Sequence, residues 1–161
     1  MVFKAAQGCK AVFLHTFSFP GLEATRAKTV IEACEKVGVM SIVASTSIFT
    51  AKQHFWHTDS IKSTVLELHQ YQLSKYEVEG IVRGSGLQSY TIFLPVMLHF
   101  DFYLPPVFEK LPRLPTCGEL DDPLTDGTKL PFIDVNDLGK YVGAALLDRA
   151  RFGGAGGLSS K

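Results

Sequence analysis

Cysteine is scarce in this chain, and neither sign of charge is in excess. The 161 residues include three cysteines, Cys9, Cys34 and Cys117, which are far apart and show no paired spacing. This pattern predicts three reduced thiols in preference to a disulfide framework or a cysteine zinc site. Lysine and arginine together number 16, as do aspartate and glutamate. Because no basic field is available to hold a phosphate backbone, we expect no nucleic-acid partner.

Long apolar runs are also missing. No stretch is long enough to cross a bilayer, so no membrane association is expected. Lys4, Gln7, Gly8 and Lys10 interrupt the first 14 residues, which excludes the apolar core of a signal peptide there. We therefore expect a cytoplasmic protein, or a nuclear one if its role is regulatory.

What is present is an ordinary globular composition. Hydrophobic residues make up 46% of the chain and charged residues 20%, which is enough apolar material for one core. No internal repeat and no linker divides the sequence, so residues 1–161 are predicted to form a single domain. Residues 153–161 are rich in glycine and lack periodicity, which predicts a frayed tail.

Short apolar runs alternate with longer amphipathic segments along the chain. Residues 11–14 form a continuous apolar run of the kind buried on both faces of a parallel sheet. An amphipathic helix is expected from residue 21 or 22 to about residue 37, and Gly38 ends it before a second apolar strand at 39–44. This strand–helix–strand unit has the size of one βαβ crossover.

A second helix and a third strand extend the pattern. Residues 48–59 lack a clear period and are expected to be irregular. The helix begins between Thr58 and Val65 and lasts to Arg83, and the strand covers residues 89–94.

The last third of the chain begins irregularly and ends in a helix. Five prolines between residues 95 and 115 predict a loop with short helices at most, and residues 116–131 are rich in turns. Phe132 and Ile133 then lead into a final helix. Asp134 is its expected N-cap, and Asp137 lies in its first turn, where a negative charge favours the helix dipole.

The most informative segment runs from His69 to Pro95. Tyr71 and Lys75 are four residues apart, so on a helix they share one face, one turn apart. Gly84 and Gly86 end that helix in the way a left-handed C-terminal turn requires. A helix that offers a phenol and an ammonium to one point, followed at once by a buried strand, is typical of α/β architecture.

Four segments together resemble the NmrA-like family, an atypical branch of the short-chain dehydrogenase/reductase superfamily. They are AVFLHT, GVMSIVASTS with the helix before it, YQLSKYEVEGIVRGSGLQSYTIFLP, and LPFIDVNDLGKYV, and they span roughly residues 8–148. The resemblance implies a Rossmann-type fold that binds NADP or NAD, with NADP favoured. Some members of the family reduce substrates, and others sense the cofactor and bind protein partners.

The sequence departs from this family in three places. No glycine-rich loop follows the first strand, although such a loop cradles the pyrophosphate of a dinucleotide. Leu94 stands where the family often has arginine, and the C-terminal substrate region is short. The expected fold class is therefore α/β: a partial Rossmann-type parallel sheet flanked by helices, with the first strands and the glycine-rich loop missing.

The missing strands would leave the strand at residues 11–14 as an open apolar edge. Such an edge is an aggregation site unless something covers it. We therefore expect a truncated product, or a chain that a partner or an oligomer completes by covering this edge.

The resemblance assigns roles to individual residues. Tyr71 and Lys75 match the catalytic Tyr-x-x-x-Lys pair of the superfamily, in which the lysine also holds the nicotinamide ribose. Ser45 or Ser47 is, by position, the catalytic serine that hydrogen-bonds the substrate carbonyl. The expected cofactor-binding residues are Thr16, Phe17, Ser45, Lys75 and Pro95.

The chemistry of a tyrosine and lysine pair is proton transfer to the oxygen of a reduced carbonyl. A tyrosine with an ordinary pKa of about 10 is a poor proton partner at neutral pH. A cation one helical turn away favours the phenolate and so lowers that pKa. The alternative is an ordinary amphipathic helix with Tyr71 as half-buried core, because Tyr-x-x-x-Lys often arises by chance.

Other clusters are better explained by packing or solvation. His54, His57 and Asp59 lack a further placed ligand, so no metal site is expected. Trp56, with Phe49 and Phe55, could line a substrate pocket or pack under its loop, and packing is favoured. A set of apolar residues at and after the third strand suggests a pocket wall, although core packing explains most of it: Phe93, Met97, Phe100, Phe102 and Tyr103.

Three functions remain open at this point. The first is an NAD(P)H-dependent oxidoreductase, or a truncated remnant of one, that acts on a small apolar carbonyl, quinone or enone. The second is a non-catalytic redox-sensing regulator that binds a protein partner. The third is a cofactor-free fragment with no function of its own.

Overall fold

The computed structural model describes residues 1–17, 19, 21–103, 107–108, 111–119, 129 and 131–153. Its contacts divide the chain into two compact units. The first comprises Met1–Leu94 and Tyr141–Lys161, and the second comprises Pro95–Lys140. All four predicted catalytic residues belong to the first unit.

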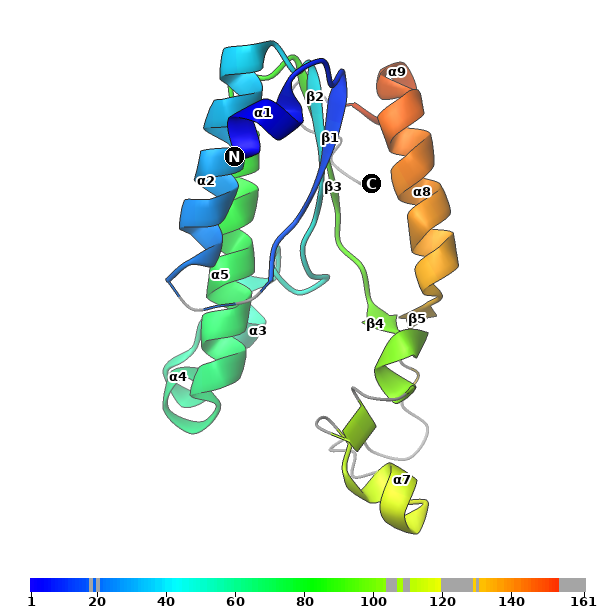
Figure 1. Cartoon of the computed structure of the whole chain (residues 1–161). Coiled ribbons are helices and arrows are strands. Elements are labelled where there is room, and N and C mark those ends of the chain that lie inside the picture. Colours follow the sequence, from blue (N-terminus) through cyan, green and yellow to red (C-terminus); the bar gives the residue numbers. More distant parts are fainter. Residues whose placement is uncertain are drawn as a thin grey trace. The chain divides into compact units, whose positions relative to one another are not determined.

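Three parallel strands form the sheet of the first unit (Figure 1). They are β1 (Ala11–His15), β2 (Ser41–Ser45) and β3 (Ser89–Phe93), in the order β1-β2-β3. In the register, Ala11 lies opposite Ser41, and Ser41 lies opposite Ser89. The predicted α/β class and the parallel arrangement of the three strands are confirmed, and their carboxyl ends meet at one edge of the sheet.

Two long helices, α2 (Glu23–Val37) and α5 (Leu66–Arg83), lie side by side along this sheet (Figure 1). Each presents apolar residues at helical spacing to the strands. Gly38 adopts a left-handed φ of 78°, which ends α2 and turns the chain into β2. The core between the helices and the strands consists of Leu14, Ala27, Ile31, Ile42, Ala44, Val78 and Val82.

A short N-terminal helix, α1 (Val2–Ala6), packs against α2. Ala6, Cys34 and Val39 form a second, smaller cluster of buried residues there. Cys34 is buried, and the other two cysteines are exposed. All three are free thiols, as predicted.

Two short helices occupy the segment between β2 and α5. The first, α3 (Gln53–Trp56), lies where the sequence predicted irregular structure, and that prediction is wrong because a four-residue helix is too short to show a period. The second, α4 (Asp59–Thr64), begins inside the range predicted for the start of a helix. Thr58 caps α4 by accepting a hydrogen bond from the Ile61 N–H, and Val65 separates α4 from α5.

The chain re-enters the first unit through α8 (Val135–Leu147). Asp134 caps this helix as predicted, because its Oδ1 accepts the Asn136 N–H at 2.8 Å. The short helix α9 (Arg149–Phe152) follows and lies beside β3, where the Thr91 hydroxyl donates to the Phe152 carbonyl at 2.8 Å. The predicted frayed tail lies, from residue 154 on, outside the described residues.

The second unit contains a two-stranded parallel sheet of β4 (Met97–Leu98) and β5 (Phe132–Ile133). A 3₁₀ turn, η1 (His99–Phe102), and a short helix, α7 (Arg113–Cys117), complete its described elements. The prediction of short helices over residues 95–115 is confirmed, whereas the two-residue strand was missed. Much of the predicted turn-rich segment, residues 120–128, lies outside the described part of the chain.

The burial of the strands depends on their place in the sheet. All five residues of β2 are buried, but in β1 only Leu14 is buried, so the prediction of a doubly buried strand is wrong for residues 11–14. Within the described chain, β1 pairs with β2 and its other side is open. Phe13, which stacks on the His15 ring, is 42% exposed on this edge strand.

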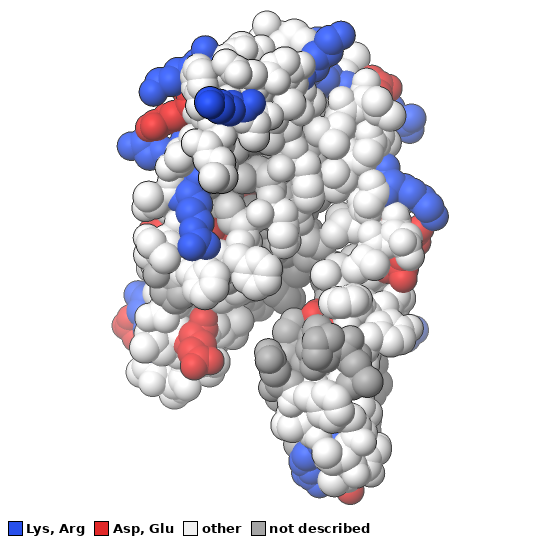
Figure 2. Space-filling model, viewed as in Figure 1, with Lys and Arg blue, Asp and Glu red and all other residues white. Residues whose placement is uncertain are grey.

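Charges of both signs are interspersed on the face of the molecule shown in Figure 2. In the described part of the chain, no helix combines the length and the apolar character that crossing a membrane needs.

Candidate functional site

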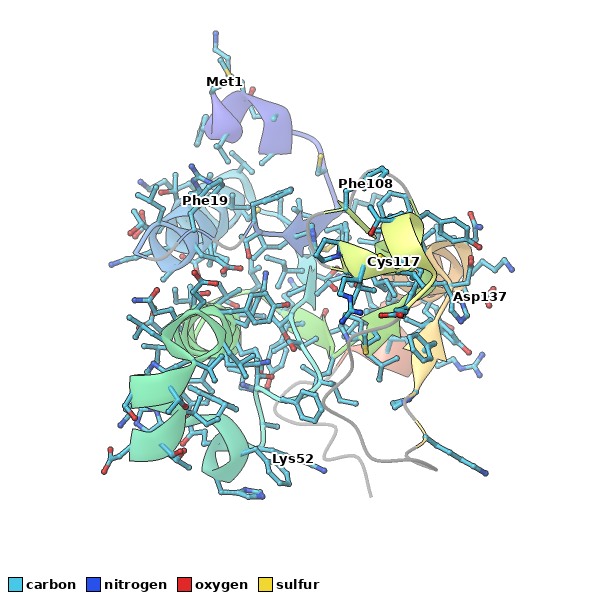
Figure 3. The ribbon with its side chains drawn as sticks, turned by 90° about the horizontal axis from the view of Figure 1, so that it is seen from below. Met1, Phe19, Lys52, Phe108, Cys117 and Asp137 are labelled. Atoms are coloured by element: carbon cyan, nitrogen blue, oxygen red, sulfur yellow. The ribbon has the colours of Figure 1, made fainter. Side chains whose placement is uncertain are left out.

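Helix α5 brings Tyr71 and Lys75, the two central residues of the predicted site, to the carboxyl edge of the sheet. Figure 3 shows the molecule viewed along the strands from this edge. Tyr71 and Lys75 share one face of α5, as predicted from their spacing. The Lys75 Nζ lies 5.6 Å from the centroid of the Tyr71 ring. Tyr71 is 38% exposed, whereas Lys75 is buried. The ammonium thus lies on the buried side of a partly exposed tyrosine.

Lys75 is bound within the chain by two oxygen atoms. Its Nζ donates to Oε1 of Glu23 at 2.6 Å and to the main-chain carbonyl of Thr16 at 2.8 Å. Glu23 is the first residue of α2, and Thr16 follows β1. The ammonium therefore ties α5 to the loop that joins β1 and α2.

Glu23 is fully buried, and three side chains satisfy its carboxylate. Besides Lys75, the Thr16 hydroxyl donates to Oε1 and the Ser74 hydroxyl donates to Oε2, the latter at 2.7 Å. Burial opposes ionisation of this carboxyl, but the hydrogen bonds from Lys75, Thr16 and Ser74 outweigh it and hold its pKa below the ordinary value. At neutral pH the pair is an ion pair, so the Lys75 charge is compensated where it stands.

The charge of Lys75 also reaches His15, the last residue of β1. The pKa of His15 is lowered, first by its partial desolvation and then by the nearby Lys75 cation, with Glu23 acting in the opposite direction. His15 is therefore a neutral imidazole at pH 7 beside the stacked Phe13 ring.

The two candidate serines lie where the sequence placed them, at the end of β2, but both are buried. Ser45 is the last residue of β2, and Ser47 accepts a hydrogen bond from the Gln72 amide at 3.4 Å. Gln72 is itself buried, and its Oε1 has no partner among the described residues. Neither serine hydroxyl is open to a substrate in this arrangement.

The predicted cofactor-binding residues fall in different surroundings. Thr16 is buried and belongs to the Glu23 network, whereas Phe17 next to it is 73% exposed. Phe19 lies beside α2 (Figure 3), where the Arg26 guanidinium covers its ring at 5.3 Å. Pro95 is half-buried and begins the second unit, so it is described only within that unit.

A second buried carboxylate, Glu79, was not predicted from the sequence. The hydroxyls of Thr46 and Thr50 both donate to its Oε1, the first at 2.7 Å, and Arg83 pairs with Oε2 at 2.8 Å. Glu79 thus ties the loop after β2 to α5. A glutamate four residues before an arginine is usual on an exposed helix face, so the sequence offered no signal of its burial.

Two histidines meet beside Trp56 in the α3–α5 region. His69 Nε2 and His57 Nδ1 are 3.3 Å apart, and the buried Trp56 ring contacts both imidazoles. The Trp56 indole N–H donates to the Phe49 carbonyl at 2.8 Å, so Trp56 packs under its loop as predicted. Within the described residues, no group of three or more His, Cys, Asp or Glu side chains could hold a metal ion.

A parallel sheet with two helices along it defines an α/β protein of the Rossmann type. The chain belongs to the NmrA-like family, whose model matches residues 1–157. This confirms the resemblance drawn from the sequence. No curated protein matches the chain.

Several solved structures share the fold, among them the following two. One is ChuY, an anaerobillin reductase from Escherichia coli O157:H7, with a TM-score of 0.57 and 15% identity over 89% of this chain and 62% of that one. The other is a short-chain dehydrogenase/reductase (wide type) from Veillonella parvula in complex with NADP, with a TM-score of 0.58 and 12% identity over 94% of this chain and 63% of that one. The chain thus spans less than two thirds of the length of either structure.

The described residues fit one end of a nicotinamide dinucleotide and not the other. The partly exposed Tyr71 ring and the exposed Phe17 suit a ribose and its base, since both offer flat surface beside polar groups. A pyrophosphate instead needs the N–H groups of a glycine-rich turn at a helix N-terminus. Between β1 and α2 the sequence has the single glycine Gly21, and the first residue of α2 is the buried Glu23, whose carboxylate is already paired with Lys75.

Proposed function

We propose that this chain is an NAD(P)-binding protein and acts as an NAD(P)H-dependent oxidoreductase on a small apolar carbonyl, quinone or enone. The observation that supports this best is the placement of Tyr71 and Lys75 one turn apart at the carboxyl edge of a parallel sheet. In open α/β sheets ligands bind outside this edge. Membership of the NmrA-like family, and the likeness to a reductase-type structure that contains NADP, favour the same class of cofactor, with NADP ahead of NAD.

In this proposal each residue has a defined part. A reduced nicotinamide, when bound, would supply the hydride, and the Tyr71 hydroxyl would give a proton to the substrate oxygen. Lys75 stabilises the ionised Tyr71 and holds the ribose, and Thr16 and Phe17 border that ribose. Ser45 or Ser47 hydrogen-bonds the substrate carbonyl once the loop after β2 exposes its hydroxyl.

The pyrophosphate must be held from elsewhere, because the described residues do not fit it. We propose that a further segment or a partner chain supplies the glycine-rich turn and pairs with the open side of β1. The same pairing would cover the exposed Phe13 and the unpaired main-chain groups of that strand.

One observation favours a second candidate, a non-catalytic regulator that binds the cofactor and a protein partner. The Lys75 ammonium is already paired with Glu23 at 2.6 Å and is buried, so it does not stand ready to activate the phenol. A chain in this state can respond to nucleotide without turning over.

Calorimetric titration with NADPH and NADH tests the cofactor part of the proposal. We expect saturable binding with NADPH the tighter ligand, and a chain with no saturable heat for either nucleotide contradicts it. Tyr71→Phe then separates the two candidates, since an oxidoreductase loses about 100-fold or more in quinone-dependent NADPH oxidation. A regulator shows no turnover in either form and keeps its affinity for the nucleotide.

A further inference from the structure

The strongest unexplained feature of the carboxyl edge is that the buried Lys75 ammonium is held by other groups of the chain itself. Lys75 has three N–H groups, of which two are taken by Glu23 Oε1 and the Thr16 carbonyl. Glu23 has no exposed surface, and both of its oxygens accept hydrogen bonds. The Glu23 carboxylate is therefore a buried and well hydrogen-bonded partner of the cation, unlike the carboxylate of an exposed ion pair.

The Glu23–Lys75 ion pair lies at the proposed cofactor site, which distinguishes it from an ion pair that only stabilises the fold. Thr16, which contributes both its carbonyl and its hydroxyl, is the residue that follows β1, where the cofactor ribose is expected. Lys75 also lies 5.6 Å from the centroid of the partly exposed Tyr71 ring. A single side chain, Glu23, thus competes with both of the roles that Lys75 has in the proposed function.

Electrostatics gives the direction of that competition. A cation near a phenol favours the phenolate, and a carboxylate bonded to the same cation cancels most of that effect. A buried ammonium that leaves its carboxylate must find another anion or reach water, because an unpaired buried charge is strongly unfavourable. Lys75 therefore stays with Glu23 unless the carboxylate loses its charge or a ligand offers better partners.

We propose that Glu23 is a positioning residue that withholds the Lys75 ammonium inside the chain and so decides whether Lys75 reaches a bound ribose and the Tyr71 hydroxyl. The inference rests on the proposed function in treating Lys75 as a ligand of that site. It goes further in assigning the control of Lys75 to a carboxylate from α2.

The first experiment needs no cofactor. Lysine acetylation at fixed pH, followed by peptide mass spectrometry, compares Lys75 with Lys28, whose side chain is 69% exposed. In the unaltered chain we expect Lys75 to react roughly tenfold or more slowly than Lys28, because it is buried and paired. In the Glu23→Gln variant Lys75 should approach the rate of Lys28.

The matched control is Glu79→Gln, which removes the other buried carboxylate of the described residues, one that lies on α5 itself. A general loosening of the fold would raise Lys75 reactivity in both variants, and that result overturns the proposal. Equal Lys75 rates in the unaltered chain and in Glu23→Gln overturn it as well.

The second experiment links the release of Lys75 to the nucleotide. We expect Glu23→Gln to bind NADPH roughly tenfold more tightly, the effect of one additional charge-assisted hydrogen bond, and Glu23→Gln/Lys75→Met to lose this gain. If Lys75 is released but no variant binds NADPH, the proposed function fails and the role of Glu23 survives. If NADPH binds but Glu23→Gln changes neither Lys75 reactivity nor affinity, the role of Glu23 fails and the proposed function survives.

Discussion

Lys75 and Glu79 lie one helical turn apart on α5, and each fastens a different loop to the carboxyl edge of the sheet. Lys75 binds the loop after β1 through the Thr16 carbonyl and Glu23. Glu79 binds the loop after β2 through the hydroxyls of Thr46 and Thr50. Two buried charges of opposite sign on one helix thus fix both loops from which a ligand site at this edge must be built.

Lys75→Met should destabilise the fold strongly, because it leaves the Glu23 carboxylate buried without its cation. Breaking a buried ion pair in this way costs about 3–5 kcal/mol. The matched control is Lys28→Met, whose exposed pair with Glu32 contributes about 1 kcal/mol or less. Urea unfolding measures the free energy of unfolding of both variants. Equal losses would show that the buried pair stabilises the fold no more than the exposed pair does.

The double variant Glu23→Gln/Lys75→Met removes both charges of the same ion pair. With no carboxylate left to be stranded, we expect the double variant to be more stable than Lys75→Met alone. A loss equal to the sum of the two single losses would mean that the two side chains act independently, contrary to their 2.6 Å contact.

Glu79→Gln should loosen the loop after β2 without unfolding the sheet. Within this loop the Thr50 N–H donates to Ser47 and the Lys52 N–H to Phe49. Weakening the hydrogen bonds from Thr46 and Thr50 to the carboxylate removes about 1.5–3 kcal/mol of local stability, so these amides should exchange roughly tenfold faster or more. Glu77→Gln, on the exposed side of α5, is the control and should leave their exchange unchanged.

The stability of the fold should rise with pH between about 5 and 7. The pKa of His69 is lowered from its ordinary 6.5 by burial, by His57 and by Lys62, so the unfolded chain takes up a proton first as the pH falls. His15 acts in the same direction. Urea unfolding at several pH values should show a smaller slope for His69→Gln, and an unchanged slope would contradict the buried neutral histidine.

A further loss of stability should begin as the pH falls below 4.5, the ordinary value for a glutamic acid. The pKa of Glu23 is lower in the folded chain, so the stabilisation it provides is complete above 4.5 and disappears as the pH falls through the folded value. The Glu23→Gln variant should not show this loss of stability at low pH.

The open side of β1 should make the chain associate with itself. Phe13 is 42% exposed on this strand, and the main-chain groups on the open side can pair with another strand. Sedimentation velocity over a range of concentrations should show association that Phe13→Lys reduces, since a charge on an edge strand opposes strand pairing. Phe55→Lys, at a 57% exposed site on α3, should not change it, and a monomer at all concentrations would contradict the open edge.

The strands and long helices could be predicted because each has a period or an apolar run of sufficient length. The relation of Tyr71 to Lys75 followed from the helix repeat alone. The Glu23–Lys75 pair could not be predicted, because 52 positions separate its members and a glutamate in the first turn of a helix is expected for the dipole in any case. The burial of Glu79 could not be predicted either, because a glutamate four residues before an arginine is usual on an exposed helix face.

The burial of Ser45 and Ser47 could not be predicted from the sequence either. Both follow an apolar strand, and polar residues at that point are expected to face a ligand. In the structure the loop after β2 folds back on α5 through Glu79 and Gln72, which covers them. A contact between distant helix and loop residues of this kind leaves no local pattern.

The most direct test of the proposed function is an amide NMR titration of the chain with NADPH, followed residue by residue. We predict saturable shifts confined to the carboxyl edge, at Thr16, Phe17, Ser47 and Tyr71, with little change at the opposite end of the strands. Shifts that gather elsewhere, or none at NADPH concentrations of about 5 mM, where even millimolar affinity saturates the site, would contradict a nicotinamide site at Tyr71 and Lys75.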